Sequence, residues 1–521
     1  MEGPGADLRG VDQDVDALAR GHQHGVLEVR LRQGPAVLGD HHLRDAVEMH
    51  RVDLEPLVHV ADPDQVALLR DDRLSRREAL AVDREAQRPI VQDHRDVLGD
   101  LGLIDVRIGH HERTQQPHRH LRLGHEVAVV DRQPDAALET SFANGGLIAV
   151  SQAEPWAAPG MPLKILRWLG QDDAPLVVRP RAIPQMWRWG LDFLLNCTRT
   201  RAWRGTLCNL RLALYSAAAL KEVRAETGIA YDDLTNGCLK VYGNRKELEV
   251  GIRTSAAQSP YGLTHRAMSV DDLVELEPAL GRAASRIVGG IYYPQDESGD
   301  CCKFTQAIAR LCTEGGVIFH YGTTVQKIEA NGGSVAAIET DKGRLVADHY
   351  VLSLANDSPL LMRPLGVRLP IFPVKGYSIT VPGAAWADRP KVPVIDETRK
   401  FGLIPFGNRL RISGSAEIIG YDTEIRDRRM SAILNAAADI FPDFATCCDP
   451  KTDKVWACLR PVTPDGPPVL GESPLRNLFF NTGQGHLGWT FACGSAKLVA
   501  NIVSGRPPEI DMSGLTFNRY H

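Results

Sequence analysis

The first 120 residues of this 521-residue chain contain no lysine, cysteine, phenylalanine, tyrosine or tryptophan. A folded core normally relies on aromatic side chains, because each of them buries a large apolar surface. Twelve of the 17 histidines precede residue 126, but none stands in a recognised metal-binding spacing such as H-E-x-x-H. We therefore expect residues 1–120 to be irregular or disordered, to hold no metal and to form no native domain.

Other absences apply to the whole chain. No C-x-x-C pair occurs among the ten cysteines, which argues against structural zinc and a disulfide framework and fits a reducing compartment. The formal net charge of −5 and the lack of a basic stripe argue against nucleic acid as a partner. No run of about 18 apolar residues is present, and no basic-then-apolar signal peptide begins the chain. These absences predict a soluble or peripheral protein.

From Leu121 the sequence becomes typical of a folded protein. Residues 124–131, GHEVAVVD, indicate a turn and a short buried strand that ends in a carboxylate. The second strand of a dinucleotide-binding unit has this form, and its acid accepts hydrogen bonds from a ribose. Further along, the patterns predict a helix over 303–311, strands over 317–320, 324–329, 334–339 and 350–354, and a strand, glycine loop and helix over 477–505.

The glycine loop has the sequence NTGQGHLGWT over residues 481–490. Its glycines allow a backbone to approach a flat ligand closely. The helix that follows offers free N–H groups and a partial positive charge, which suit the anionic edge of a reduced flavin as well as a phosphate. An ordinary tight loop before a helix explains the motif equally well.

A second candidate is Arg460, which ends an apolar strand just before Pro461. A guanidinium at such a position can hold a substrate carboxylate through two parallel hydrogen bonds. The alternative is a surface arginine that pairs with a local acid.

Together with five further segments, these two blocks resemble the D-amino acid dehydrogenase small-subunit family, within the glycine oxidase and D-amino acid oxidase group. The further segments are residues 137–146, 155–160, 294–301, 373–378 and 411–420. The resemblance extends from Leu121 to Tyr520. It implies a mixed α/β fold, with a discontinuous Rossmann-like FAD-binding domain (121–165, 298–360 and 456–521) interleaved with a β-sheet substrate domain (166–297 and 361–455).

The resemblance also implies FAD as the cofactor and assigns site residues. Asp131 is expected to bind the adenosine ribose and Val325 to flank the adenine. Thr140, Ser141, Ala143, Asn144, Gly145 and Gly146 are expected to line the flavin, and Gly483, Gly485, Gly488, Trp489 and Thr490 to contact the isoalloxazine. Arg460 is expected to hold the substrate carboxylate, with Tyr377 and His486 near the substrate.

The implied reaction is oxidative deamination of a D-amino acid to a 2-oxo acid and ammonia, with electrons passed to a quinone or another respiratory acceptor. The implied location is the cytoplasm, with peripheral association at the inner face of the cytoplasmic membrane as a further option. Two alternatives stay open. One is an oxygen-using amino acid or glycine oxidase of the same group, and the other is an inactive product with impaired FAD binding.

One departure from the family motivates that last alternative. The family begins with a strand, G-x-G-x-x-G and a helix, but Ile108, His110 and Arg113 stand at the three glycine positions and Pro117 interrupts the helix. No other G-x-G-x-x-G lies upstream of residue 121. Because those glycines permit the close approach of a pyrophosphate, we expect weakened FAD binding.

Overall fold

The computed structural model describes residues 27–33, 125–383, 386, 388–444 and 454–520, and for residues 27–33 only the backbone. Of the segment 1–120, it therefore describes one strand. The other residues of that segment, including Ile108, His110, Arg113 and Pro117, lie outside the described part.

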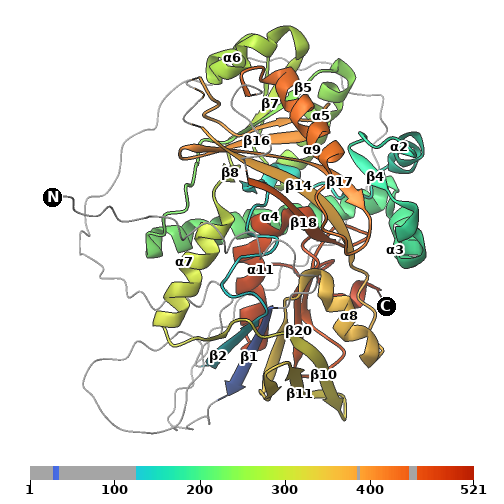
Figure 1. Ribbon diagram of the computed structural model, residues 1–521, viewed down its shortest axis with the longest axis vertical. Coiled ribbons are helices and arrows are strands. Elements are labelled where there is room, and N and C mark those ends of the chain that lie inside the picture. The colour runs from blue at the N-terminus through green and yellow to red at the C-terminus, as the bar shows by residue number, and fades with distance from the viewer. Residues whose placement is uncertain (1–26, 34–124, 384–385, 387, 445–453, 521) are drawn as a thin grey trace, which may run out of the picture. The chain divides into compact units, whose positions relative to one another are not determined.

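A six-stranded sheet has the order β19-β20-β13-β1-β2-β9 (Figure 1). Four of its strands run in one direction: β2 (His125–Asp131), β9 (Ile318–His320), β13 (His349–Leu352) and β20 (Leu478–Thr482). The other two, β1 (Leu27–Gln33) and β19 (Val469–Glu472), run antiparallel to their neighbours. Buried valines of β2 and aromatic residues of β20 fill the two faces, as expected for a sheet covered on both sides.

The direction of β1 distinguishes this sheet from a standard dinucleotide-binding sheet. Leu27 pairs with Asp131 and Gln33 pairs with His125, so β1 ends at the edge where β2 begins. In a Rossmann-type unit the strand in this position runs parallel to its neighbours, and its carboxyl end leads into the glycine loop. The chain therefore enters β1, rather than leaving it, at the edge that carries Asp131.

Three helices belong to this part of the fold: α4 (Arg199–Thr227), α7 (Cys301–Glu314) and α11 (Gly488–Val503). Helices α4 and α11 pack closely, because Gly494 has no side chain and its N–H donates to the hydroxyl of Ser216 over 2.9 Å. Helix α7 begins at Asp300, whose carboxylate accepts hydrogen bonds from the first free N–H groups. A three-stranded sheet, β10 (Val325–Asn331), β11 (Ser334–Thr340) and β12 (Gly343–Leu345), and the short helix α8 (Ser358–Met362) lie in the sequence between β9 and β14.

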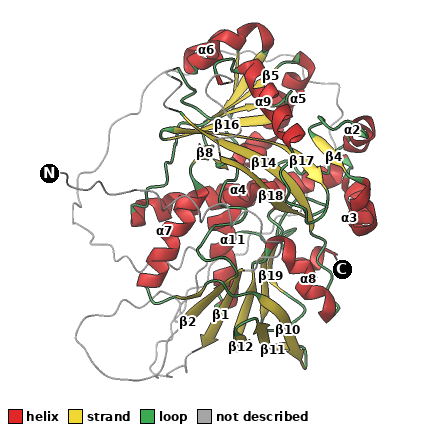
Figure 2. Cartoon of the chain, viewed as in Figure 1, coloured by secondary structure: helices red, strands yellow, loops and turns green. Residues whose placement is uncertain are grey.

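A nine-stranded sheet forms the second part (Figure 2). Its strands are β18 (Lys454–Val462), β14 (Phe372–Pro382), β17 (Arg409–Ile418), β16 (Phe401–Phe406), β15 (Val394–Asp396), β5 (Cys238–Tyr242), β7 (Gly289–Tyr293), β6 (Arg266–Met268) and, paired with β17, β4 (Leu176–Val178). Its helices are α2 (Met161–Trp168), α3 (Ile183–Asn196), α5 (Arg245–Gln258), α6 (Val270–Leu276) and α9 (Asp427–Ile440). Strands β3 (Leu147–Ile148) and β8 (Glu297–Ser298) pair separately.

The mixed α/β architecture expected from the sequence is confirmed. The strands of the six-stranded sheet after β1 come from three separate stretches of the chain, and those of the nine-stranded sheet fall between them. Strand β18 crosses the expected domain boundary between residues 455 and 456, and it belongs to the nine-stranded sheet. Among the described residues, no helix is both long and apolar enough to cross a membrane.

Candidate functional site

A cavity of about 1260 Å³ is bounded by strands β14, β17 and β18 and by the start of α11. Of the 16 site residues predicted from the sequence, it gathers 13 along its wall. These are Thr140, Ser141, Ala143, Asn144, Gly145, Gly146, Tyr377, Arg460, Gly485, His486, Gly488, Trp489 and Thr490. The structure thus brings together residues that lie up to 350 positions apart in the sequence (140 and 490), although their roles remain predictions.

The first wall is the loop over residues 140–146, which the nine-stranded sheet holds in place. Ser378 donates a hydrogen bond to the carbonyl of Ala143 over 2.6 Å, and Arg411 donates one to the carbonyl of Asn144 over 3.0 Å. Gly146 has φ +71°, and a Cβ there would lie 2.0 Å from the ring of Phe406. Only glycine fits this position, so the loop can lie directly against the ring of Phe406.

The second wall is the loop before α11. Gly485 has φ +59°, and a Cβ there would meet no atom within 4 Å. The N-terminus of α11 has no side-chain cap, and the indole N–H of Trp489 is buried without a hydrogen-bond partner. Hydrogen-bond donors without a partner therefore lie beside open space at the start of α11. Gly483 does not line the cavity, because its backbone packs against Thr463.

The third wall carries Arg460, in strand β18. Its guanidinium donates a long hydrogen bond, 3.5 Å, to the carbonyl of Ser415 and lies 5.9 Å from the ring of Trp156. Burial lowers the pKa of Arg460, as expected for a desolvated cation. Within the described residues no carboxylate lies at ion-pairing distance from it, although buried charges are normally paired.

The guanidinium occupies space that Gly376 leaves free. Strands β14 and β18 pair antiparallel, with Val374 opposite Arg460 and Gly376 opposite Cys458. A Cβ at Gly376 would lie 2.1 Å from Nη1 of Arg460, so any larger residue must displace the guanidinium. This contact could not be predicted from the sequence, because it depends on the register of two strands that lie about 80 residues apart.

His486 faces the same cavity as a neutral ring. Burial, helped by the charge of Arg460, lowers the pKa of His486 to about 4. The imidazole stacks on Trp156 with 5.3 Å between ring centroids, and Nε2 lies 3.4 Å from the carbonyl oxygen of Gln152. At neutral pH the imidazole therefore contributes an uncharged surface to the cavity next to Arg460.

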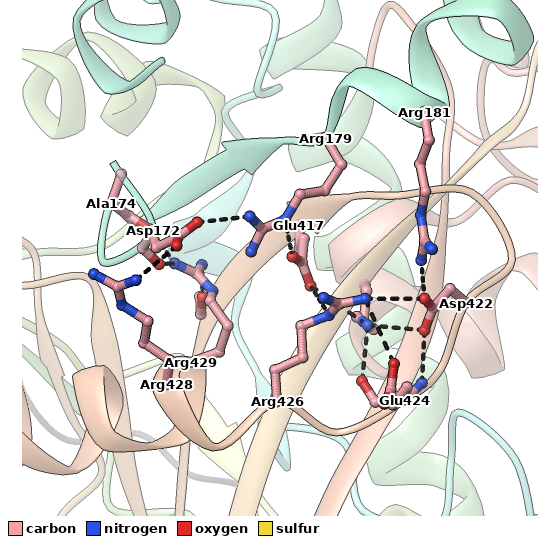
Figure 3. Close-up of polar contacts among 12 residues, drawn as sticks. Asp172, Ala174, Arg179, Arg181, Glu417, Asp422, Glu424, Arg426, Arg428 and Arg429 are labelled. Atoms are coloured by element: carbon pink, nitrogen blue, oxygen red, sulfur yellow. Dashed lines mark hydrogen bonds and ion pairs between the residues drawn. The ribbon is translucent and has the colours of Figure 1, made fainter. Parts of the chain in front are cut away.

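Tyr377 is held by a residue that the sequence did not single out. Its hydroxyl donates to Glu417 over 2.7 Å, so its one proton is already engaged. Burial raises the pKa of Glu417, but the hydrogen bonds from Tyr377 and Arg179 and the charge of Lys375 outweigh this and lower it overall. Figure 3 shows Arg179 and Arg426 converging on Glu417. This network fixes the strand side of the cavity.

Asp131 and Val325 lie outside the cavity wall. Asp131 ends β2, and its carboxylate accepts a hydrogen bond from the N–H of Gln133 over 2.9 Å. Burial, helped by the charge of Glu139, raises the pKa of Asp131 to about 6. Val325 begins β10 and is buried in the adjoining hydrophobic core. The end of β2 therefore presents a carboxylate whose ionised form would be stabilised by hydrogen bonds from hydroxyl or amide donors.

Comparison with known proteins gives one family. Residues 119–502 match the family described as FAD dependent oxidoreductase. A D-amino acid dehydrogenase of Paramagnetospirillum magneticum is 48% identical over 400 residues, which cover 77% of this chain and 94% of the relative. A D-amino acid dehydrogenase of Rhizobium johnstonii is 43% identical, with 77% and 95% covered. The resemblance stated from the sequence is confirmed.

Solved structures agree on the fold. Glycine oxidase from Geobacillus kaustophilus has a TM-score of 0.59 at 21% identity, over 76% of this chain and 92% of that one. L-proline dehydrogenase from P. horikoshii has a TM-score of 0.54 at 19% identity, over 60% of this chain and 83% of that one. These likenesses concern the fold alone.

Proposed function

Since this chain belongs to the family of FAD-dependent oxidoreductases, we propose that it catalyses the oxidative deamination of D-amino acids. The observation that carries the proposal is Arg460, a guanidinium in the cavity wall with no carboxylate partner among the described residues. Such a cation suits a substrate carboxylate, held through two parallel hydrogen bonds. The curated relatives named D-amino acid dehydrogenase support the choice of the D-enantiomer.

The enzyme is FAD-dependent, and the cavity residues fit the flavin end of the cofactor. The unpartnered indole N–H of Trp489, the uncapped start of α11 and the open space at Gly485 suit a flat ring whose edge becomes negatively charged when it is reduced. Asp131 would accept hydrogen bonds from the ribose. When bound, FAD would supply the acceptor for the hydride from the substrate Cα.

The side chains of the cavity bind and orient the substrate. Arg460 fixes the carboxylate and thereby the direction of the Cα–H bond, and the neutral ring of His486 adds no second cation next to Arg460. The amine reacts in its neutral form. The Cα–H bond breaks with its electron pair, the nitrogen loses a proton, and the resulting 2-imino acid adds water to give a 2-oxo acid and ammonia.

The proposal extends to the electron acceptor, a quinone of the respiratory membrane, and to a location on the cytoplasmic face of that membrane. The cavity supports this extension, because its wall includes apolar side chains of α2 and α3 as well as the polar group at Arg460.

The test uses protein incubated with excess FAD and follows dye reduction with D- and L-alanine. We expect activity with the D-enantiomer and no release of peroxide. Arg460→Met should lower kcat/KM, and the decrease should correspond to a loss of about 2–5 kcal/mol in transition-state binding. The exposed Arg344→Met is the matched control and should change nothing. Near-normal kinetics of Arg460→Met would assign Arg460 a structural role, and peroxide release would assign the chain to the oxidases.

A further inference from the structure

Large apolar side chains are exposed in one region of the protein. Eight of the 15 large hydrophobic residues that are exposed among the described residues lie between positions 163 and 195. They are Leu163, Leu166, Leu169, Ile183, Trp187, Leu191, Leu194 and Leu195, each between 50% and 65% exposed. We call this set the α2–α3 face. Clustered apolar exposure of this kind marks a surface that meets a partner.

The two helices that carry the face belong to one packed unit. Met161 and Ile165 of α2 pack against the small hydrophobic cluster that includes Trp189 and Phe193 of α3. Figure 1 shows α2 and α3 on either side of β4 at one margin of the nine-stranded sheet. Each helix thus uses one apolar side to join the protein and keeps a second apolar side exposed.

The region around the face is basic in an acidic chain. Residues 161–204 contain eight lysine and arginine residues and three aspartates, a net charge of +5, whereas the whole chain carries −5. Helix α2 has no acidic residue. The exposed cations Lys164, Arg167 and Arg188 lie among the apolar residues, and the guanidinium of Arg188 lies 4.9 Å from the ring of Trp187.

Two of the three local aspartates are already paired with other cations, and the third, Asp173, is exposed. Asp172 forms ion pairs of 2.6 Å with Arg179 and 2.9 Å with Arg428, as Figure 3 shows. Asp192 pairs with Arg368 over 2.8 Å. Among the described residues, Lys164, Arg167 and Arg188 form no ion pair with a carboxylate, so their charges are available for an anionic partner.

The face is continuous with the cavity. Ile183, Trp187, Leu191 and Leu194 are exposed at the surface and also line the cavity that holds Arg460. An apolar path thus connects the exterior with the site of the proposed chemistry.

From these observations we propose that the α2–α3 face docks on a bilayer of anionic lipid and receives the quinone from it. Leucine and tryptophan side chains enter the interface, while lysine and arginine side chains contact the anionic headgroups. The docking is peripheral. The quinone route rests on the proposed function, whereas the docking itself does not.

The test measures co-sedimentation of the full chain with phosphatidylglycerol-containing vesicles and with phosphatidylcholine vesicles. We expect binding to the first and weak binding to the second. Leu166→Glu/Leu195→Glu, at two positions outside the cavity wall, should lower binding at least tenfold. Val250→Glu, on α5 and 52% exposed, is the matched control and should bind normally.

A second variant tests the charges without touching the apolar residues. Lys164→Gln/Arg167→Gln/Arg188→Gln should lower binding to anionic vesicles on the order of 100-fold, since each cation near such a surface contributes about a factor of five. Raising the salt from about 0.1 M to about 0.5 M should weaken binding of the unchanged protein.

Three results would overturn the docking proposal: no binding of the unchanged chain to anionic vesicles, equal binding of the double glutamate variant, or self-association through the face in place of vesicle binding. Dye reduction with a D-amino acid separates the two proposals, because it needs no membrane. Dye reduction that is unchanged in the double variant, together with slower reduction of a quinone embedded in vesicles, supports the route from the bilayer.

Discussion

At the scale of single residues, the position of Arg460 depends on the missing side chain at Gly376. Gly376→Ala introduces a methyl group within 2.1 Å of the guanidinium, so the arginine must leave its place. We expect a rise in KM of at least tenfold for a D-amino acid in the FAD-loaded enzyme, or about 1.4 kcal/mol. Gly281→Ala is the control, because its Cβ would meet Val274 at an ordinary 3.7 Å. Equal KM values for the two variants would contradict the predicted role of Arg460.

A second residue couples stability to pH. Burial raises the pKa of Asp131 to about 6 from an ordinary 3.8, so ionisation opposes folding. Its contribution to stability is fully present below pH 3.8 and is lost as the pH rises through 6. Asp131→Asn should therefore stabilise the FAD-free protein by about 1–3 kcal/mol at pH 8 and by nothing below about pH 4. Urea unfolding at several pH values measures this, with the exposed Asp173→Asn as the control, and a gain independent of pH would contradict it.

The sequence predicted which residues line the site better than it predicted the residues that hold them in place. The glycine loops and Arg460 could be recognised because each has a local pattern, and the structure places them in one cavity. Gly376 and Glu417 could not, because their contacts with Arg460 and Tyr377 arise only from strand pairing. Asp131, Val325 and Gly483 were predicted in the site but do not line the cavity.

At the scale of elements, periodicity located the helix over 303–311 within α7 (Cys301–Glu314) and the strand over 350–354 close to β13 (His349–Leu352). Local apolar patterns were sufficient there, because each element buries one side. Strand β1 was not predicted, although its sequence LEVRLRQ alternates apolar and polar residues as a half-buried strand does. The lack of aromatic residues in the surrounding segment argued against any folded element there.

The contact between α4 and α11 gives a prediction for a pair of elements. A Cβ at Gly494 would lie 2.7 Å from the Cβ of Ser216 and 2.8 Å from its Cα, so Gly494→Ala must push the helices apart. We expect a loss of about 1–3 kcal/mol in the free energy of unfolding. Gly190→Ala, in helix α3 with only Met186 at 3.4 Å, should be neutral or slightly stabilising. Denaturant unfolding of both variants checks this, and a stable Gly494→Ala protein would show that the two helices can adjust.

At the scale of the whole molecule, the residues predicted to contact the flavin are nearly all present in the cavity wall. The chain upstream of residue 121, in contrast, has no G-x-G-x-x-G to bind the pyrophosphate. Replacing residues 1–120 with a strand, G-x-G-x-x-G and a helix joined at Leu121 should raise the affinity for FAD at least tenfold, or about 1.4 kcal/mol. Retention of flavin absorbance through gel filtration measures the effect. A graft with valine at the three glycine positions is the control. Stoichiometric FAD in the unchanged protein would contradict the expected weakness.

The antiparallel strand β1 also affects how the protein can fold. Without it, the six-stranded sheet would consist of two parallel parts, β2 with β9 and β13 with β20, which make no pairing with each other. The pairing of Leu31 with His349 closes a loop of more than 300 residues, and because closing so long a loop is slow, we expect the two parts to be joined late in folding. Until then β2 and β13 each present an unpaired edge, which can take up any extended segment of suitable length, including one from another chain. The centre of this sheet is therefore a position for a donor strand, which the protein fills from its own N-terminal region.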